Sequence, residues 1–367
     1  MTKESQVLVL ITYVLVAIGI VMIYSASAVY SDQIYKHSSY FLIRQIIFVA
    51  IGSFVFFLSS SLDPDFLRKQ SLVIIGISIV MLVAIFMPFL GHTAGGARRW
   101  IQLPFFTFQP AEFTKLSMCV YLADYLSRKS KAISTGSLVV FIPPIAILFV
   151  LLGLMIVQPD LGSCIFLLLL CGTLFFLSGI RFRYIMIAGV LVAIVLVFLI
   201  LEAPYRMRRI TAYLDPWKDP QGSGFQIIQS FIAFGLGGIR GAGLGESTQK
   251  LFYLPQAHTD FIFSIIGEEL GLIGTVVIVI LYFAFFVVGI RIAQRSRSPF
   301  HRLLAYALTL LITLQAIINL LVVLGLIPTK GLPLPFISYG GTALIFHMMA
   351  VGVLVAIDRS SILFSGR

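Results

Sequence analysis

Ionisable side chains beside long apolar segments are the residues of this sequence best placed to do chemistry. A charged group is costly in a membrane, so each one within or next to an apolar segment is a candidate functional residue. The foremost candidate is Asp260, because His258-Thr259-Asp260 leads directly into a long apolar segment. A carboxylate at that position can act as a general base. It can also cap the helix that follows, and the sequence leaves both roles open.

Small residues follow Asp260 at helical spacing. At about 100° per residue, they fall beneath it on one face of the predicted helix. A strip of small residues permits either close packing of a second helix or a groove for a lipid-linked substrate. The strip consists of Ser264, Gly267, Gly271 and Gly274.

An acid and a base share one face of another predicted helix. Glu112 and Lys115 are spaced i, i+3, so their side chains can meet. They either neutralise each other as a structural ion pair, or Lys115 binds a phosphate group while Glu112 keeps its ammonium group oriented and charged. Both interpretations are open at this point.

Further candidates lie at breaks between apolar segments. Arg98 and Arg99 can anchor the chain at lipid headgroups or clamp a diphosphate. Asp160 follows Gln158-Pro159 and can cap the next helix after a tight turn. Lys330 lies in a segment rich in Pro and Gly. Irregular backbone at membrane depth is tolerated where it is buried or lines a cavity, so we predict a polar cavity there.

The elements that must position these residues are transmembrane helices. The 367 residues are 59% hydrophobic and 11% charged, with a mean hydropathy of +1.03, which is outside the range of soluble domains. We predict an all-α integral membrane protein of about ten transmembrane helices, forming a single polytopic domain over residues 1–367. The first segment is long enough to span a bilayer and is interpreted as a retained helix, not a cleaved signal. The predicted spans are 7–26, 41–61, 71–90, 109–126, 138–157, 161–178, 184–201, 261–290, 303–326 and 336–357.

The basic residues indicate the orientation of these helices. The net charge is +11, from 26 Lys and Arg against 15 Asp and Glu. In the short loops, Lys and Arg are concentrated on the side of both termini, which predicts cytoplasmic termini in the inner membrane. The candidate residues then face the outer leaflet. Residues 202–260 form a large extracytoplasmic loop, in which 225–234 are predicted to form a short amphipathic helix lying on the membrane. The alternative is that this loop packs as a cap over the bundle.

Some classes of chemistry are not supported by the sequence. The basic residues cluster at the ends of the spans, which disfavours a nucleic-acid partner. No nucleotide-binding or hydrolase motif occurs in a suitable context, so no organic cofactor is expected. Cys119, Cys164 and Cys171 lie in apolar runs without metal-ligand spacing, so neither a disulfide framework nor a zinc site is predicted.

Several specific motifs are spread over the whole chain. They are MIYSAS at 22–27, FQPAEFTK at 108–115, QPDLG at 158–162, YRMRR at 205–209, LDPW at 214–217, GSGFQ at 222–226, KLFYLPQAHTDFIF at 250–263 and PFISYGG at 335–341. Together they closely resemble the SEDS (shape, elongation, division, sporulation) family of FtsW, RodA and SpoVE. The FtsW and SpoVE branch fits better than RodA.

This resemblance implies a function and its partners. It implies a ten-helix peptidoglycan glycosyltransferase that polymerises glycan strands from lipid II at the outer face of the membrane, during cell division. The implied partners are a class B penicillin-binding protein and other divisome membrane proteins. A divalent cation, Mg²⁺ or Mn²⁺, is compatible with the resemblance, but its ligands are unknown. The essential aspartate of the family matches Asp260, and the residues at motif positions around its cavity are Arg99, Glu112, Lys115, Asp160 and Lys330.

These residues suggest a mechanism and leave two alternatives. Asp260 would remove the proton from the 4-hydroxyl of an acceptor GlcNAc, which attacks C1 of a donor MurNAc and releases undecaprenyl diphosphate with inversion. Arg99 and Lys115 are the first choices for offsetting the diphosphate charge. A lipid II flippase is the main alternative, and a noncatalytic scaffold is the other. The location of the polar residues at one face weakens the flippase interpretation.

Overall fold

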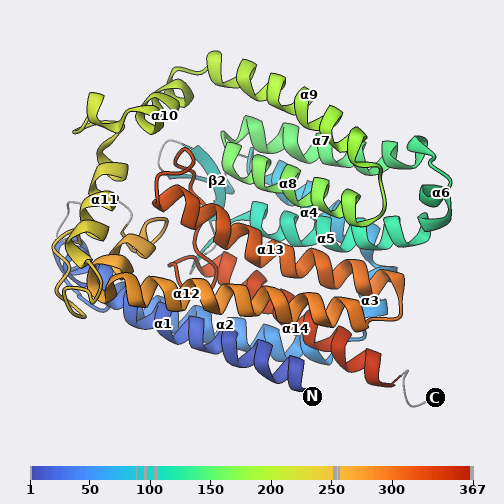
Figure 1. The fold of residues 1–367 in the computed structure, drawn as a ribbon, viewed down its shortest axis with the longest axis horizontal. Coiled ribbons are helices and arrows are strands. Elements are labelled where there is room, and N and C mark those ends of the chain that lie inside the picture. Colours follow the sequence, from blue (N-terminus) through green and yellow to red (C-terminus); the bar gives the residue numbers. More distant parts are fainter. Residues whose placement is uncertain are drawn as a thin grey trace.

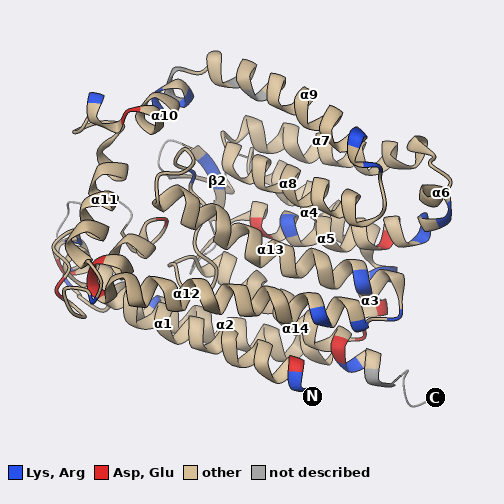
Figure 2. Ribbon diagram, in the orientation of Figure 1, with Lys and Arg blue, Asp and Glu red and all other residues tan. Residues whose placement is uncertain are grey.

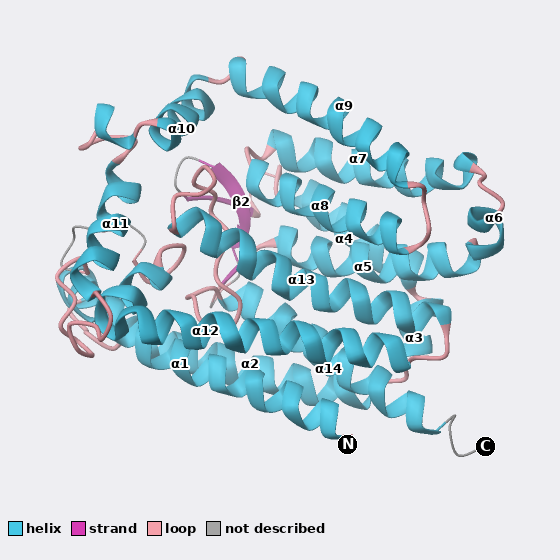
Figure 3. Cartoon of the chain, in the orientation of Figure 1, coloured by secondary structure: helices cyan, strands magenta, loops and turns pink. Residues whose placement is uncertain are grey.

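The protein is described here from a computed structural model, which covers residues 2–87, 89–94, 97–102, 104, 106–250, 254 and 257–363. Helices dominate the structure (Figure 3) and most run side by side as a bundle (Figure 1). The first layer contains α1 (Lys3–Tyr35), α2 (Tyr40–Ser61), α12 (Ile262–Arg295) and α14 (Gly341–Leu363). Within it, α14 packs along α2, and α1 packs along α12.

Small residues allow α2 and α14 to approach closely. A Cβ atom added to Gly52 would lie 3.2 Å from the Met348 side chain, and one added to Gly352 would clash with Ser59. In a membrane, helices associate through such close packing, because the lipid supplies little hydrophobic driving force.

The remaining helices of the bundle pack behind this layer. They are α3 (Pro64–Lys69), α4 (Ser71–Ala84), α5 (Pro110–Arg128), α6 (Ser130–Ser134), η1 (Leu138–Phe141), α7 (Ile142–Val157), α8 (Leu161–Leu177), α9 (Phe182–Leu201) and α13 (Pro299–Val323). In this set, α13 is central and contacts α5, α8, α12 and α14. By contrast, α9 lies along the edge of the bundle (Figure 1) and contacts α8 and α10.

Each predicted span coincides with a helix. In the described part of the chain, six helices are long and apolar enough to cross a membrane, and further apolar helices are shorter, so the protein is a multi-pass membrane protein. The helices differ in extent from the predicted spans, since α1 runs from Lys3 to Tyr35, α4 ends at Ala84 and α14 begins at Gly341. The late start of α14 agrees with the irregular segment predicted before it. Charged residues gather mostly near the ends of the helices (Figure 2).

A small antiparallel sheet joins α4 to α5, and the sequence did not predict it. The sheet has the strand order β1 (Gly91–Ala94), β2 (Ala97–Gln102) and β3 (Thr107–Phe108). In its register, Gly91 is opposite Ile101, which is in turn opposite Phe108. Strands this short carry too few alternating residues to show a period of two. Arg98 and Arg99 therefore lie on β2, where a loop was expected.

The long segment between α9 and α12 contains three helical elements, α10 (Pro204–Leu214), η2 (Pro216–Lys218) and α11 (Phe225–Gly237). The helix predicted at 225–234 is confirmed as α11, and it packs on α12 as the packed-cap alternative predicted. The Ser230 and Ser264 hydroxyls lie 2.7 Å apart, and a Cβ atom on Gly267 would lie 2.4 Å from the Phe234 ring. The strip of small residues beneath Asp260 is therefore a helix-packing face, and the groove interpretation is wrong for this strip.

At Gly271, α12 is interrupted. This residue has φ 65° and ψ −163°, a conformation that residues with a Cβ atom rarely adopt. The backbone of the preceding loop fills the break, because Leu272 N–H donates to Gly238 O at 2.9 Å and Ala242 N–H donates to Glu268 O at 2.9 Å. The long loop is consequently joined to α12 by main-chain hydrogen bonds as well as by packing.

Candidate functional site

Asp260 lies in a turn immediately before α12. The N-cap residue of α12 is Phe261, so the alternative in which Asp260 caps this helix is wrong. Its backbone carbonyl accepts a hydrogen bond of 2.8 Å from the Asn319 side chain on α13. The same amide group donates to Leu332 O at 2.8 Å. Asn319 therefore ties the Asp260 turn to residues 324–340, which precede α14 and which we call the irregular segment.

That segment holds the turn at two more points. Ser338 Oγ donates to Thr259 O at 2.6 Å, and Tyr339 N–H donates to His258 O at 2.9 Å. Phe336 has φ 68°, so the backbone here is irregular, as the Pro and Gly residues predicted. All these contacts use main-chain atoms of residues 258–260, and none of them uses the Asp260 carboxylate.

The backbone at Lys330 and Gly331 lies close to both Asp260 and Asp160. A Cβ atom added to Gly331 would be 3.2 Å from Asp260 Oδ2. One added to Gly162 would be 3.7 Å from both Lys330 Cβ and Asp160 Oδ1. Burial lowers the pKa of Lys330 to about 8, because desolvation disfavours the charged ammonium group. The structure therefore brings together three residues that are far apart in the sequence.

Asp160 is the N-cap of α8, as one of its two interpretations predicted. Its carboxylate accepts hydrogen bonds from Ser163 N–H at 3.2 Å and from Ser163 Oγ at 2.8 Å. A guanidinium nitrogen of Arg99 lies 4.0 Å from Asp160 Oδ1. Arg99 also donates to Gln158 O at 3.3 Å and to Pro159 O. It thus connects β2 to the turn before α8.

The two arginines of β2 have different roles. Arg99 is partly exposed and faces the residues described above, whereas Arg98 turns back and donates to Met87 O at 2.6 Å. Alternate residues of a strand point to opposite faces, so both could not face one site. The idea of an Arg98–Arg99 clamp is therefore wrong in this form, and Arg99 alone belongs to the site.

Arg209 is a residue of the site that sequence reasoning missed. It lies on α10 and donates to Thr329 O at 3.3 Å, next to Lys330. Burial raises the pKa of Asp260 to about 6, while the positive charges of Arg209 and Arg99 act in the opposite direction. Both guanidinium groups therefore influence the carboxylate. The basic motif YRMRR was visible in the sequence, but nothing there showed that α10 would lie over Asp260.

Glu112 and Lys115 form the structural ion pair. Their charged atoms lie 2.7 Å apart, and Lys115 is fully buried. The Lys115 ammonium group also donates to Gln315 Oε1 at 2.9 Å, and Gln315 Nε2 donates to Pro333 O at 2.9 Å. The pair thus supports the irregular segment from below. A direct contact between Lys115 and phosphate, as predicted, is not compatible with this burial.

The polar residues Gln315 and Asn319 also escaped sequence reasoning. They are four residues apart on α13, so they share one helix face, and both donate to carbonyl groups of the irregular segment. Two amides at this spacing in an otherwise apolar helix were a usable signal. Their side chains satisfy backbone groups that have no helical partner.

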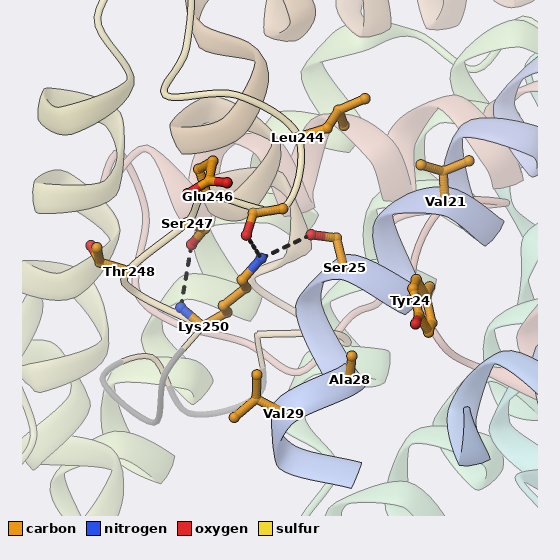
Figure 4. A pocket seen from close by; sticks show the side chains of 11 residues that line it. Val21, Tyr24, Ser25, Ala28, Val29, Leu244, Glu246, Ser247, Thr248 and Lys250 are labelled. Carbon is orange, nitrogen blue, oxygen red and sulfur yellow. Dashed lines mark hydrogen bonds between the residues drawn. The ribbon is translucent and has the colours of Figure 1, made fainter. Parts of the chain in front are cut away.

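Two cavities of several hundred Å³ in the described structure lie away from these residues. The first, of about 600 Å³, lies between α1 and residues 244–250 (Figure 4). Its Lys250 ammonium group contacts Glu269 at 3.0 Å and Ser25 at 3.2 Å, so the polar groups there hold the loop to the bundle. The second, of about 590 Å³, lies beside α3 and α5 around the ion pair of Asp124 and Arg128, 2.9 Å apart.

The described residues do not form a metal-ion ligand set. Over this part of the chain, no group of three or more His, Cys, Asp or Glu side chains is placed to hold a metal ion. The Asp160 carboxylate is occupied by Ser163. The divalent cation stays a prediction from the resemblance. The chemistry available at the site is that of one carboxylate with a raised pKa, under the influence of the positive charges of Arg99 and Arg209, with Lys330 on the adjacent segment.

The relatives of this chain share its whole length. The protein is 44% identical over 359 residues to a probable peptidoglycan glycosyltransferase FtsW of Geobacter sulfurreducens, covering 97% of this chain and 95% of the relative. It is 42% identical over 360 residues to stage V sporulation protein E of Bacillus subtilis, covering 98% of each.

Two solved structures have the same fold. One comes from a peptidoglycan synthase complex described as coordinating polymerization and crosslinking, with a TM-score of 0.80, 28% identity and coverage of 96% of this chain and 97% of that chain. The other is the rod shape determining protein RodA of Thermus thermophilus, with a TM-score of 0.69, 23% identity and coverage of 96% of each chain. The family model FTSW_RODA_SPOVE, described as cell cycle protein, matches residues 5–362. With these matches, the chain belongs to the FtsW, RodA and SpoVE family.

Proposed function

We propose that this protein is a peptidoglycan glycosyltransferase that polymerises glycan strands from lipid II, with Asp260 as the general base. The observation that carries the proposal is the placement of Asp260, which the backbone holds firmly while its carboxylate stays uncommitted beside cationic groups. Relatives named peptidoglycan glycosyltransferase support the reaction class. The Asp260 carboxylate would thus supply the base for joining membrane-bound sugars into a polymer.

The reaction requires one proton transfer and one displacement. Asp260 accepts the proton from the 4-hydroxyl of the lipid II GlcNAc, and that oxygen forms a bond to C1 of the MurNAc at the end of the growing strand. The bond from C1 to the diphosphate oxygen breaks, and undecaprenyl diphosphate leaves with both electrons. Attack opposite the α-linked diphosphate inverts the configuration to give a β-1,4 bond. Asp260 afterwards returns its proton to water.

Cationic side chains offset the charge on the leaving group. Arg99 and Arg209 act on the Asp260 carboxylate from β2 and α10, and Lys330 lies on the adjacent irregular segment, so a diphosphate bound among them would be neutralised as the bond breaks. Asp160 restrains Arg99, and the Glu112–Lys115 pair positions the segment that carries Lys330. These two acids and Lys115 act by positioning and do not touch the reacting atoms.

The setting of the reaction follows from charge and from the relatives. The basic loops support cytoplasmic termini in the inner membrane, with the site on the extracytoplasmic side. A relative structure from a complex that coordinates polymerization and crosslinking supports a crosslinking partner, which we take to be a class B penicillin-binding protein. We extend the proposal to other divisome membrane proteins as partners and to a role in cell division, because relatives named FtsW favour both.

The test is a polymerisation assay with purified protein, its penicillin-binding partner and lipid II. We expect wild type to produce glycan chains and Asp260→Ala to produce none. Glu246→Gln, which removes an exposed carboxylate from the same loop, is the matched control and should retain activity. Equal polymerisation by wild type and Asp260→Ala would overturn the assignment of the base. Lipid II transfer across liposomes without polymerisation would instead favour the flippase.

A further inference from the structure

A cluster of aromatic rings leads away from the Asp260 turn. The His258 ring, two residues before Asp260, lies 4.4 Å from the Phe41 ring and 5.6 Å from that of Tyr30, measured between centroids. Phe41 in turn lies 5.2 Å from Tyr40. We call this cluster the aromatic surface, and its members are Tyr30, Tyr35, Tyr40, Phe41, His258 and Tyr339.

The far end of the aromatic surface is exposed. The rings of Tyr35 and Tyr40 stack with centroids 3.8 Å apart and planes at 8°, and 45% of Tyr35 is accessible. The guanidinium group of Arg44 lies 4.6 Å from the Tyr40 centroid. Tyr30 is 36% exposed. Exposed aromatic rings gathered in one place mark a binding surface more often than a solvated one.

The length of α1 places this end outside the hydrocarbon. With 33 residues, α1 is about 50 Å long at about 1.5 Å per residue. The hydrocarbon core of a bilayer is about 30 Å thick. Tyr30 and Tyr35 follow the predicted span 7–26 and occupy the last turns of α1, so they stand above the acyl chains. Lipid tails are therefore not the ligand that these rings meet.

We propose that the aromatic surface binds the sugar rings of the glycan strand as the strand extends from Asp260. This inference rests on the proposed function, because it takes a sugar to be the group that reacts at Asp260. A pyranose ring has an apolar face of C–H groups and a rim of hydroxyls. Tyrosine matches both features, since it combines a flat apolar ring with a polar tip and loses little conformational entropy on binding.

The elements that carry the two kinds of group support this occupant. Arg99 on β2 and Arg209 on α10 act electrostatically on the Asp260 carboxylate. The aromatic surface is formed by α1, α2, His258 and Tyr339, with Arg44 of α2 beside Tyr40. The arginines of β2 and α10 therefore suit the diphosphate, and the rings of the aromatic surface suit the sugars.

A binding measurement tests the surface without catalysis. The Asp260→Ala protein is titrated with a lipid-free octasaccharide of alternating GlcNAc and MurNAc, with and without the added changes Tyr35→Ala and Tyr40→Ala. We expect the two tyrosine changes to weaken binding about tenfold, through the loss of two stacking rings. Tyr35→Phe with Tyr40→Phe keeps the rings and should retain binding. Tyr184→Ala is the matched control, because Tyr184 also lies under an arginine, with 4.7 Å from Arg183 to its ring, but on α9.

The lengths of the products give a second readout. In the catalytically intact protein, we expect Tyr35→Ala with Tyr40→Ala to shorten the glycan chains on a gel and Tyr184→Ala to leave them unchanged. If the tyrosine variants have the same octasaccharide affinity and the same chain length as their parent proteins, the inference is overturned and the proposed polymerisation still stands. If wild type does not polymerise but the octasaccharide binds in a tyrosine-dependent way, the proposed function fails and the surface stands.

Discussion

A carboxylate can accept a proton only after it has lost its own. At the residue scale, burial raises the pKa of Asp260 to about 6 and lowers that of Lys330 to about 8. Between these values the carboxylate is ionised and the ammonium group is charged, which is the combination that the proposed reaction needs. The two groups therefore define a window of activity centred near neutral pH.

We expect the polymerisation rate to be bell-shaped in pH. Below about pH 6, Asp260 becomes protonated, so the rate should fall about tenfold per pH unit. Above about pH 8, Lys330 loses its charge and leaving-group stabilisation weakens. Initial rates of lipid II consumption measured from pH 5 to about pH 10 would show both limbs.

The Lys330→Arg variant serves as the control for the alkaline limb. Arginine keeps its charge throughout this range, so the limb above pH 8 should disappear while the acidic limb stays. An alkaline limb that is identical in both proteins would show that another group controls it.

Sequence reasoning found part of the site because charge in a membrane is conspicuous. Asp260, Asp160, Arg99 and Lys330 were each isolated polar residues next to apolar segments, and the structure brings them together. The partners of backbone groups were harder to identify. An amide such as Asn319 carries no charge, and its role depends on where an irregular segment passes in space.

At the element scale, α12 illustrates what helical spacing can and cannot show. The period of small residues correctly gave a face beneath Asp260, but the same period describes a groove and a packing interface. The choice depended on α11, which lies within the long loop and covers this face. The break at Gly271 was also hidden, because a glycine inside a helical pattern is usually tolerated.

We expect Gly271→Ala to lower the free energy of unfolding by about 2 kcal/mol or more. An added Cβ atom would lie 2.4 Å from Gly241 N and 2.6 Å from Ile239 O, and the backbone has a positive φ. Denaturant unfolding of the protein in detergent, followed by circular dichroism, measures the effect.

Gly153→Ala provides the comparison for this variant. Gly153 lies within α7 and has no atom within 4 Å of an added Cβ, so alanine there should stabilise the protein by up to about 1 kcal/mol. Equal stability of Gly271→Ala and wild type would show that the loop and the helix can separate at little cost.

At the scale of the whole molecule, the prediction of the fold rested mostly on the lengths of the apolar segments and on the positions of the charged residues. Apolar segments long enough to span a bilayer coincide with helices because every backbone group in lipid must find a partner within its own segment. The sheet of β1, β2 and β3 had no comparable signal. Pairings between distant segments were not predictable either, since one sequence without an alignment shows no contacts.

The orientation of the bundle can be tested by labelling. In a background where Cys119, Cys164 and Cys171 are replaced, we expect Glu246→Cys to react with a membrane-impermeant maleimide in intact spheroplasts. Lys131→Cys, on α6 at the other end of the bundle, should react only after permeabilisation. The reverse pattern would place the Asp260 site in the cytoplasm and contradict the proposed polymerisation outside it.

The fastening of the Asp260 turn has a consequence for how the site can vary. Asn319, Ser338 and Tyr339 hold positions 258–260 through hydrogen bonds to their backbone carbonyl groups. A change of side chain at 260 therefore leaves the anchors of the turn in place, and a loss of activity there reports on chemistry and not on misfolding. Position 260 is thus a place where selection can act on reactivity alone, independently of the architecture that presents it.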